Sequence, residues 1–317
     1  MNVMKRFTLR SLKANKKWTV VTLIGIILST AMLSAVSTFC ASFMELLRNE
    51  AIAENGNWHA MVSDVKIRDV PVFEEVEWMD KIALIRDVGY APLENSKNKN
   101  KPYLFIRQFS EDACQNFPFT LIEGRMPKKE DELLLPQHLQ TNGGITYQVG
   151  DQITVKIGKR ISLLGRSLGQ STLYQSPDFS DGESFLFEQE RRYTVVGMIK
   201  RPSFEPTIAP GYTAISFLDP DTLGPDEKIT VTLLSKKLKH RFYSDVFSLA
   251  ERIGIGSDQI VFNNDLLHYS GVSADSITQN VIYGFALVFV LIIMIASVSL
   301  IYNAFSISVS ERVSQLG

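Results

Sequence analysis

The stretch Trp18–Phe39, which reads WTVVTLIGIILSTAMLSAVSTF, decides the fold. It lies within a run of 27 residues that contains no Asp, Glu, Lys or Arg. A second stretch, Val281–Tyr302, reads VIYGFALVFVLIIMIASVSLIY and lies within 35 uncharged residues. A hydrocarbon layer of about 30 Å needs roughly 20 apolar residues in a helix. The sequence therefore predicts an integral membrane protein with two spans, at residues 18–40 and 277–304.

Basic residues before the first span predict its orientation. Residues 1–17 hold six Lys and Arg and no acidic residue. Lys and Arg beside a span stay in the cytoplasm, so we expect residues 1–17 and 305–317 inside and residues 41–276 outside. This predicts a multi-pass protein of the plasma membrane with an extracellular central domain. We interpret the basic tail as an amphipathic helix on the inner leaflet; a disordered anchor is the alternative.

A cleaved signal peptide is the alternative interpretation of the first span. Its apolar run of 22 residues is longer than the usual core of about 7–15 residues. Cys40 suggests a lipoprotein, but the bulky Phe39 beside it does not suit lipoprotein cleavage. We therefore favour an uncleaved span.

The charge and cysteine content of the central region argue against several kinds of binding site and against an internal disulfide. It holds 26 basic and 33 acidic residues, which gives a net charge of −7. This balance argues against a nucleic-acid binder or a protein that binds anionic lipid through this region. Cys40 and Cys114 are the two cysteines of the chain. The outer domain thus has no internal disulfide, and we expect Cys114 to be a small, buried apolar residue.

Both spans are predicted to continue as helices outside the membrane. Apolar residues keep a helical spacing after Phe39 until Asn55-Gly56-Asn57 ends the helix. Ser273 is a predicted N-cap for a helix that begins outside and enters the second span. Two unbroken helices of this kind form a stiff connection, which suits the transmission of movement across the membrane.

Between the spans, the pattern predicts an α+β domain. Runs of alternating apolar residues, separated by turn residues, indicate strands, and two segments with helical spacing indicate helices. The expected strands are 59–65, 82–85, 103–109, 152–157, 193–199 and 228–234, and the expected helices are 131–140 and 243–253. Residues 158–190, rich in Gly, Ser and Asp, are interpreted as an inserted hairpin or loop. This region could consist of two subdomains, with the boundary between them near residues 115–130.

Signals of an enzyme are poor. The four His residues are isolated, and neither HxxxH nor CxxC spacing occurs. Gly158-Lys159 lacks the upstream glycine and the following Ser or Thr of a phosphate-binding loop. We therefore expect no catalytic residue, no cofactor and no metal site, and we expect any ATPase activity to reside in a partner subunit.

Small residues recur four apart in the first span. Gly25 with Ser29 and Ala31 with Ala35 are candidates for close helix packing. The alternative is that small residues are simply common in spans. Neither predicted span contains an ionisable residue, which argues against a proton or ion pathway.

Several segments resemble one family. Ser299–Gly317 is similar to the start of the permease domain in FtsX-like, MacB-type ABC transporter permeases. The other similar segments are Leu9–Lys17, Gly25–Ser29, Glu123–Pro127, Gly150-Asp151, Tyr193–Ile199 and Ala209–Thr213. Those in the central region resemble the long permeases of Gram-positive bacteria. The likeness runs over nearly the whole chain.

The resemblance implies a permease subunit that pairs with a separate cytoplasmic ABC ATPase. In this family ATP binding closes the ATPase dimer, the spans shift, and the stalk helices move the outer domain, to export or handle peptides or lipophilic substrates. By similarity, Ser310, Glu311 and Arg312 begin the segment that contacts the ATPase; the alternative is that Glu311 and Arg312 form a solvated pair that fixes topology. The other partners that the resemblance implies are membrane lipid and either further permease spans or a second permease copy. It implies no nucleic acid.

The chain also departs from the family. Members of the family carry at least four spans, so we expect these residues to be the N-terminal portion of a permease, ending just after its second span, or one part of a split or truncated permease. The competing function is a two-span membrane receptor with an extracytoplasmic ligand-binding domain. Against it, few residues follow the second span to carry a signalling coiled coil or kinase.

Overall fold

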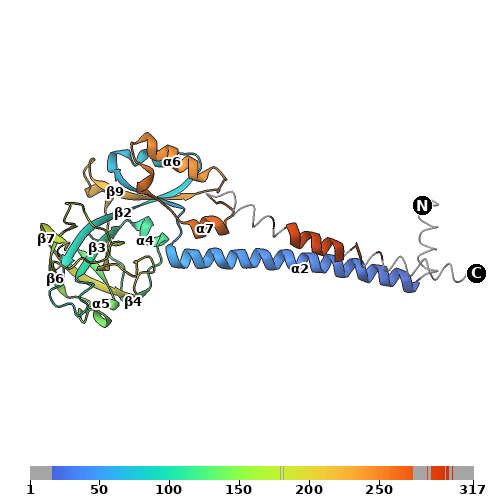
Figure 1. The fold of residues 1–317 in the computed structure, drawn as a ribbon, viewed down its shortest axis with the longest axis horizontal. Helices are drawn as coiled ribbons and strands as arrows, with labels where there is room; N and C mark the ends of the chain where they lie inside the picture. The colour runs from blue at the N-terminus through green and yellow to red at the C-terminus, as the bar shows by residue number, and fades with distance from the viewer. Residues whose placement is uncertain are drawn as a thin grey trace, which may run out of the picture. The chain divides into compact units, whose positions relative to one another are not determined.

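The computed structural model describes residues 16–178, 180, 182–273, 284, 287–296, 298–299 and 302. The described chain divides into two compact units. One is drawn from the two ends of the chain, and the other is Arg48–Val272. Figure 1 labels many of their helices and strands.

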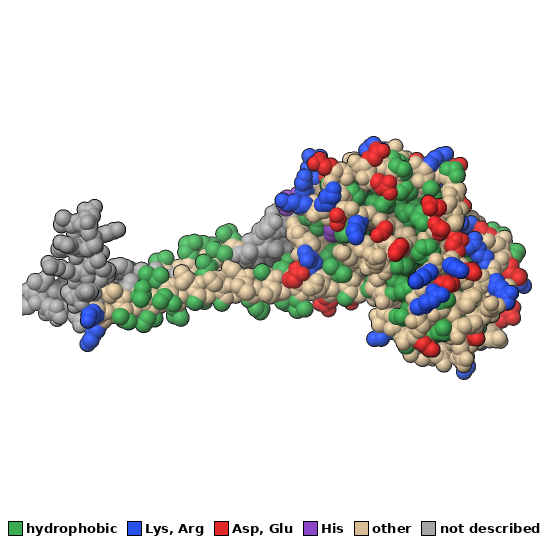
Figure 2. Space-filling view, turned by 180° about the vertical axis from the view of Figure 1, so that it is seen from behind, with side chains coloured by type: hydrophobic (Ala, Val, Ile, Leu, Met, Phe, Trp, Pro, Cys, Tyr) green, Lys and Arg blue, Asp and Glu red, His purple; other side chains and the backbone are tan. Residues whose placement is uncertain are grey.

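The helix α2 (Lys16–Asn55) contains the first predicted span. It has 40 residues, and its part from Leu23 to Asn55 is long and apolar enough to cross a membrane. Its apolar side chains are largely exposed, as suits a surface that faces lipid. The helix continues without a break to Asn55, as the sequence predicts. Figure 2 shows a long uncharged surface on the middle of this helix, with charged side chains toward its two ends.

The second predicted span is described only in part. A shorter apolar helix covers Leu287–Ala296. Most of the rest of residues 277–304 lies outside the described residues, as do residues 1–15 and 305–317. The tail helix, the second complete span and the multi-pass topology therefore stay predictions.

The unit Arg48–Val272 is built on one ten-stranded sheet, with strand order β10-β1-β9-β2-β3-β8-β5-β7-β4 and with β6 paired to β2 and β7. The strands are β1 (Ala60–Lys66), β2 (Met79–Pro92), β3 (Tyr103–Phe109), β4 (Leu121–Gly124), β5 (Glu132–Pro136), β6 (Gln152–Ile161), β7 (Ser184–Ile199), β8 (Gly211–Phe217), β9 (Lys228–Ser235) and β10 (Ile260–Phe262). The α-helices of this unit, after the end of α2, are α3 (Pro71–Glu74), α4 (Glu111–Asn116), α5 (His138–Thr141), α6 (Phe242–Arg252) and α7 (Asn264–Tyr269). The α+β class predicted from the sequence is thereby confirmed.

One end of the sheet consists of β10, β1, β9 and β2, all antiparallel to their neighbours. Helical crossovers join β1 to β2 and β9 to β10, which is the split β-α-β arrangement. The helix α6 covers this end (Figure 1). Its residues Phe242, Val246, Leu249 and Ala250 are buried, and this spacing places them on one helical face.

The long strand β2 joins the two ends of the sheet. Residues Met79–Ile85 pair with β9, and residues Ile85–Pro92 pair with β3. A register shift lies beside Gly89, whose φ of 137° and whose close approach to the Gly158 carbonyl both require glycine. Because β2 runs through both ends, the expected division near residues 115–130 is wrong. The second end of the sheet is instead formed by the segment inserted between β2 and β9.

All six predicted strands are present, but one predicted helix is wrong. Residues 131–140 form β5 followed by the short α5. Leu133, Leu134 and Leu135 are fully buried between β7 and β8, so both faces of this strand are apolar. A short apolar run of this kind has no period of two and cannot be told from a helix by its spacing. Residues 158–190 contain the arms of the β6–β7 hairpin and its long end loop, as the sequence predicts.

Candidate functional site

The C-terminal end of α2 is held by a set of hydrogen bonds that we call the helix clamp. The clamp consists of Gly56, Trp58, Asn116, Ser203 and Asn263, where the Asn116 carbonyl accepts from the Asn57 N–H at 2.7 Å. Gly56 ends the helix: its N–H donates to the Ile52 carbonyl at 2.8 Å, and its φ of 101° lies in the left-handed region. An added Cβ would lie 2.8 Å from the Asn116 carbonyl oxygen, so no larger residue fits without displacement.

Side chains from separate segments complete the clamp. Trp58 Nε1 donates to the Asn55 carbonyl at 2.6 Å. Asn263 Nδ2 donates to the Gly56 carbonyl at 3.2 Å, while Asn263 Oδ1 caps α7. Ser203 Oγ donates to the Glu54 carbonyl. The last carbonyls of a helix lack partners within the helix, and the clamp supplies these partners from the folded domain.

The main chain after the clamp enters the sheet directly. His59 donates its N–H to the Leu233 carbonyl at 2.8 Å, and His59 Nδ1 accepts from the Ser235 N–H at 3.0 Å. Burial, together with the nearby charge of Arg48, lowers the pKa of His59 to about 4. His59 is thus a neutral acceptor that fixes the start of β1 to β9.

An aromatic cluster lies beside the clamp. The Trp58 ring stacks on Phe117 with ring centroids 6.4 Å apart. Phe117 in turn contacts Phe109, Phe119 and Phe204 at centroid distances of 5.1–6.4 Å. Phe204 follows Ser203, which donates a hydrogen bond to α2. The loop that carries both residues is therefore anchored in this cluster.

The buried carboxylate of Glu205 also holds the loop that carries Ser203 and Phe204. Glu205 Oε1 accepts from Lys101 Nζ at 2.7 Å and Arg201 Nε at 3.0 Å, and lies 2.9 Å from His138 Nε2. The Thr213 N–H donates to Oε2 at 2.8 Å. Burial opposes ionisation of Glu205, but the hydrogen bond and charge of His138 and those of Lys101 prevail and lower its pKa to about 2. This carboxylate is therefore ionised and structural.

A second buried ion pair orders the end of the β6–β7 hairpin. Arg160 Nε and Nη2 donate to the two oxygens of Glu183 at 2.8 and 2.6 Å, and both side chains are fully buried. The guanidinium also donates to the carbonyls of Gly169, Thr172 and Leu173. One arginine thus satisfies three carbonyls of the loop between the two strands.

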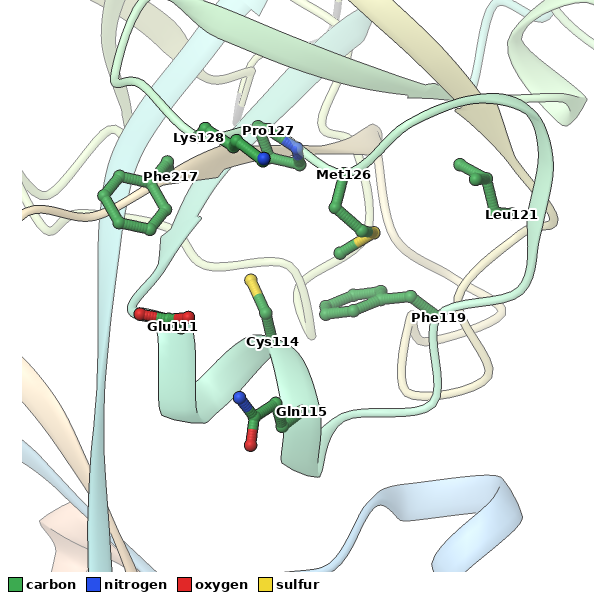
Figure 3. A pocket seen from close by; sticks show the side chains of 9 residues that line it. All are labelled: Glu111, Cys114, Gln115, Phe119, Leu121, Met126, Pro127, Lys128 and Phe217. Carbon is green, nitrogen blue, oxygen red and sulfur yellow. The ribbon is translucent and has the colours of Figure 1, made fainter.

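A cavity of about 650 Å³ lies between α4 and the segment that runs from Phe119 to Lys128. Its walls are largely apolar, as Figure 3 shows. The apolar lining residues are Cys114, Phe119, Leu121, Met126, Pro127 and Phe217. Burial, with the nearby Glu111, raises the pKa of the Cys114 thiol to about 12. The thiol is therefore uncharged and forms part of the apolar wall.

The structure does not bring the residues predicted for function into one site. On α2, Gly25 is buried, Ala31 and Ala35 are exposed, and the side chain of Ser29 is not described. In the same unit Ile293 is 6% exposed although most of its neighbours are exposed. Ser310, Glu311 and Arg312 lie outside the described residues. The packing and coupling roles therefore stay predictions.

The end of α2 can be predicted from the sequence, but the clamp cannot. The Asn55-Gly56-Asn57 turn was visible as a local signal. Ser203 and Asn263 lie 149 and 207 residues from their partners, so no local pattern could reveal them. Within the described residues, no group of three or more His, Cys, Asp or Glu side chains could hold a metal ion.

No protein-family model and no curated protein matches the chain, and the solved structures that are similar to it include the following three. The periplasmic region of MacB from Actinobacillus actinomycetemcomitans is 12% identical over 68% of this chain and 94% of that one, with a TM-score of 0.37. The extracellular domain of the noncanonic ABC-type transporter YknZ from Gram-positive bacteria is 8% identical over 65% and 99%, also at 0.37. A domain of a putative permease from Porphyromonas gingivalis is 14% identical over 61% and 71%, at 0.33.

Proposed function

We propose that this chain is a permease subunit of an FtsX-like, MacB-type ABC transporter, and that α2 carries movement between the membrane and the outer domain. The observation that supports this proposal most directly is the helix clamp. A continuous helix ends where Ser203 donates to the Glu54 carbonyl and Asn263, which caps α7, donates to the Gly56 carbonyl. Just after it, the Asn57 N–H donates to the carbonyl of Asn116 in α4. A joint of this kind transmits tilt or translation, whereas a flexible linker would lose it.

The length of α2 supports the same function. At about 1.5 Å per residue, 40 residues extend about 60 Å, which is roughly twice the thickness of a hydrocarbon layer. The helix therefore suffices for a span and for a stalk outside it. In this proposal the N-terminus is cytoplasmic, the second apolar stretch returns to the cytoplasm, and Arg48–Val272 lies outside the cell.

The driving force comes from a partner in this proposal. A cytoplasmic ABC ATPase binds near Ser310, Glu311 and Arg312 and supplies the energy of ATP hydrolysis. Further permease spans or a second permease copy complete the membrane part, with Gly25 and the small residues near it at the packing surface. The cargo class is a peptide or a lipophilic molecule that the outer domain handles.

The test inserts two glycines between Asn55 and Gly56 in the complete permease, assembled with its ATPase. Hydrogen exchange of residues 48–272 is measured with and without ATP. We expect ATP to change exchange in the wild type and to have no effect on these residues in the insertion variant, which still binds the ATPase. The same insertion after Gly165, where a Cβ would meet open space, is the matched control and should retain the ATP response.

Two results would contradict the proposal. A chain that purifies from its native membrane without any P-loop ATPase favours the two-span receptor. An insertion variant that keeps the full ATP response shows that α2 does not carry the movement.

A further inference from the structure

We propose that the free edge of β4, together with the neighbouring cavity, binds an extended peptide from another protein. The peptide adds to the sheet as a strand and places one apolar side chain in the cavity. This inference does not depend on the proposed transport function, because it rests on Arg48–Val272 alone.

The first observation is the position of β4. It is the last strand of the sheet order, and among the described strands it pairs with β7 alone. Its four residues are all exposed, including Leu121 at 41% and Ile122 at 45%. A strand with one neighbour offers main-chain groups for pairing with another chain.

Proteins often protect an edge by making the strand short or irregular, and β4 has both features. A protective edge also carries charged or polar side chains, and β4 has one of these, the exposed Glu123. Here two consecutive large apolar residues remain uncovered, and one of them lines a cavity. Protection alone does not account for this combination.

The second observation is the cavity itself. Its volume of about 650 Å³ lies in the range of ligand pockets, roughly 300–1,000 Å³. Leu121 belongs both to β4 and to the cavity wall, so a strand bound at the edge lies next to the opening. In Figure 3, Phe119, Leu121 and Met126 lie on one side of the cavity, where an apolar side chain would be received.

Two charged residues at the cavity indicate which residues flank the apolar anchor of the peptide. Glu111 and Lys128 lie at the opposite side of the cavity, and neither forms an ion pair with another described side chain. A peptide with one basic and one acidic residue beside its apolar anchor would pair with both groups. The chemistry of the partner is therefore an extended segment with an apolar anchor and charged neighbours of both signs.

The test uses the full chain in detergent and three fluorescent heptapeptides. Each peptide has a central anchor of leucine, phenylalanine or methionine, flanked by valines, with one lysine and one glutamate further out. Binding is measured by fluorescence anisotropy. We expect at least one peptide to bind more tightly than about 1 mM, and we expect replacement of its anchor by alanine to weaken binding about tenfold.

Changes in the peptide and in β4 distinguish the contribution of the strand edge to binding from that of the cavity. N-methylation of alternate peptide amides keeps the side chains but removes main-chain donors, and it should abolish binding. Leu121→Asp should weaken binding about tenfold. Ile122→Asp has the same charge on the same strand but does not line the cavity, and it should change the affinity less than twofold.

Three results would overturn the proposal. The first is no binding of any of the three peptides. The second is equal binding of the N-methylated peptide, because main-chain pairing is then absent. The third is a concentration-dependent dimer of the chain that Leu121→Asp abolishes while the peptides do not bind, because the edge then serves a second copy of the chain.

Discussion

At the residue scale, Gly56 is a position where both the backbone conformation and the surrounding atoms exclude a side chain. Replacement by alanine adds a Cβ at a φ of 101° and 2.8 Å from a carbonyl oxygen. We expect Gly56→Ala to lower the free energy of unfolding by about 2–4 kcal/mol, through backbone strain and steric overlap together. Gly254→Ala is the control, since Gly254 has a φ of 74° but open space around it, and it should cost about 1 kcal/mol. Urea unfolding of both variants measures the difference, and equal losses would show that the contact with Asn116 is relaxed at little cost.

His59 is also a residue-scale determinant, and it makes stability depend on pH. Its pKa is about 4 in the folded protein and 6.5 in its ordinary state. Between these values the unfolded protein binds more protons, so the free energy of unfolding falls as the pH decreases from 6.5 toward 4, by at most roughly 3 kcal/mol. His59→Asn keeps an acceptor near the Ser235 N–H but cannot titrate. Its unfolding free energy should depend less on pH between 5 and 7, whereas an unchanged slope would assign the dependence to other groups.

At the element scale, the β6–β7 hairpin depends on Arg160. Arg160→Met leaves Glu183 buried without its cation, and breaking such a pair costs about 3–5 kcal/mol. We expect the loop between the two strands to become sensitive to protease while the rest of the domain remains folded. Lys159→Met is the control, because Lys159 is about half exposed and pairs with Glu188 at the surface. Similar cleavage of both variants would mean that Arg160 does not order the loop.

The elements also show how far the sequence determines the fold. The sequence predicts β3 and α6 nearly to the residue: the buried residues of α6 have a helical spacing, whereas β3 is buried on both faces but follows a loop rich in Lys and Asn that marks its start. β5 was missed because Leu133–Leu135 is buried on both faces and has no such period. The clamp joins residues distant in the sequence, so no local pattern could predict it. The cavity is lined by residues within 111–128 together with Phe217, and its shape depends on how this segment packs in three dimensions.

At the scale of the whole molecule, charges of both signs are mixed on the face of the sheet-containing unit that Figure 2 shows, with Lys and Arg interspersed with Asp and Glu. A nucleic-acid-binding surface would concentrate one sign of charge. The apolar α2 and the mixed surface are consistent with a membrane helix that continues into a water-exposed domain.

The sheet order has a consequence for the time course of synthesis. β1 pairs with β9 and β10, which follow it along the chain by more than 160 residues. The first strand made is therefore among the last to find its neighbours, and contacts so distant in sequence form slowly. We expect ribosome-stalled chains that expose residues 1–226 to leave β1 sensitive to protease, and chains that expose residues 1–272 to protect it. Protection of the shorter chains would contradict this expectation.

In the cell, this delay gives the half-made domain an interval with an unpaired apolar strand. Chains in such a state are prone to aggregate. We therefore expect slower synthesis before β9 to lower the yield of the folded domain.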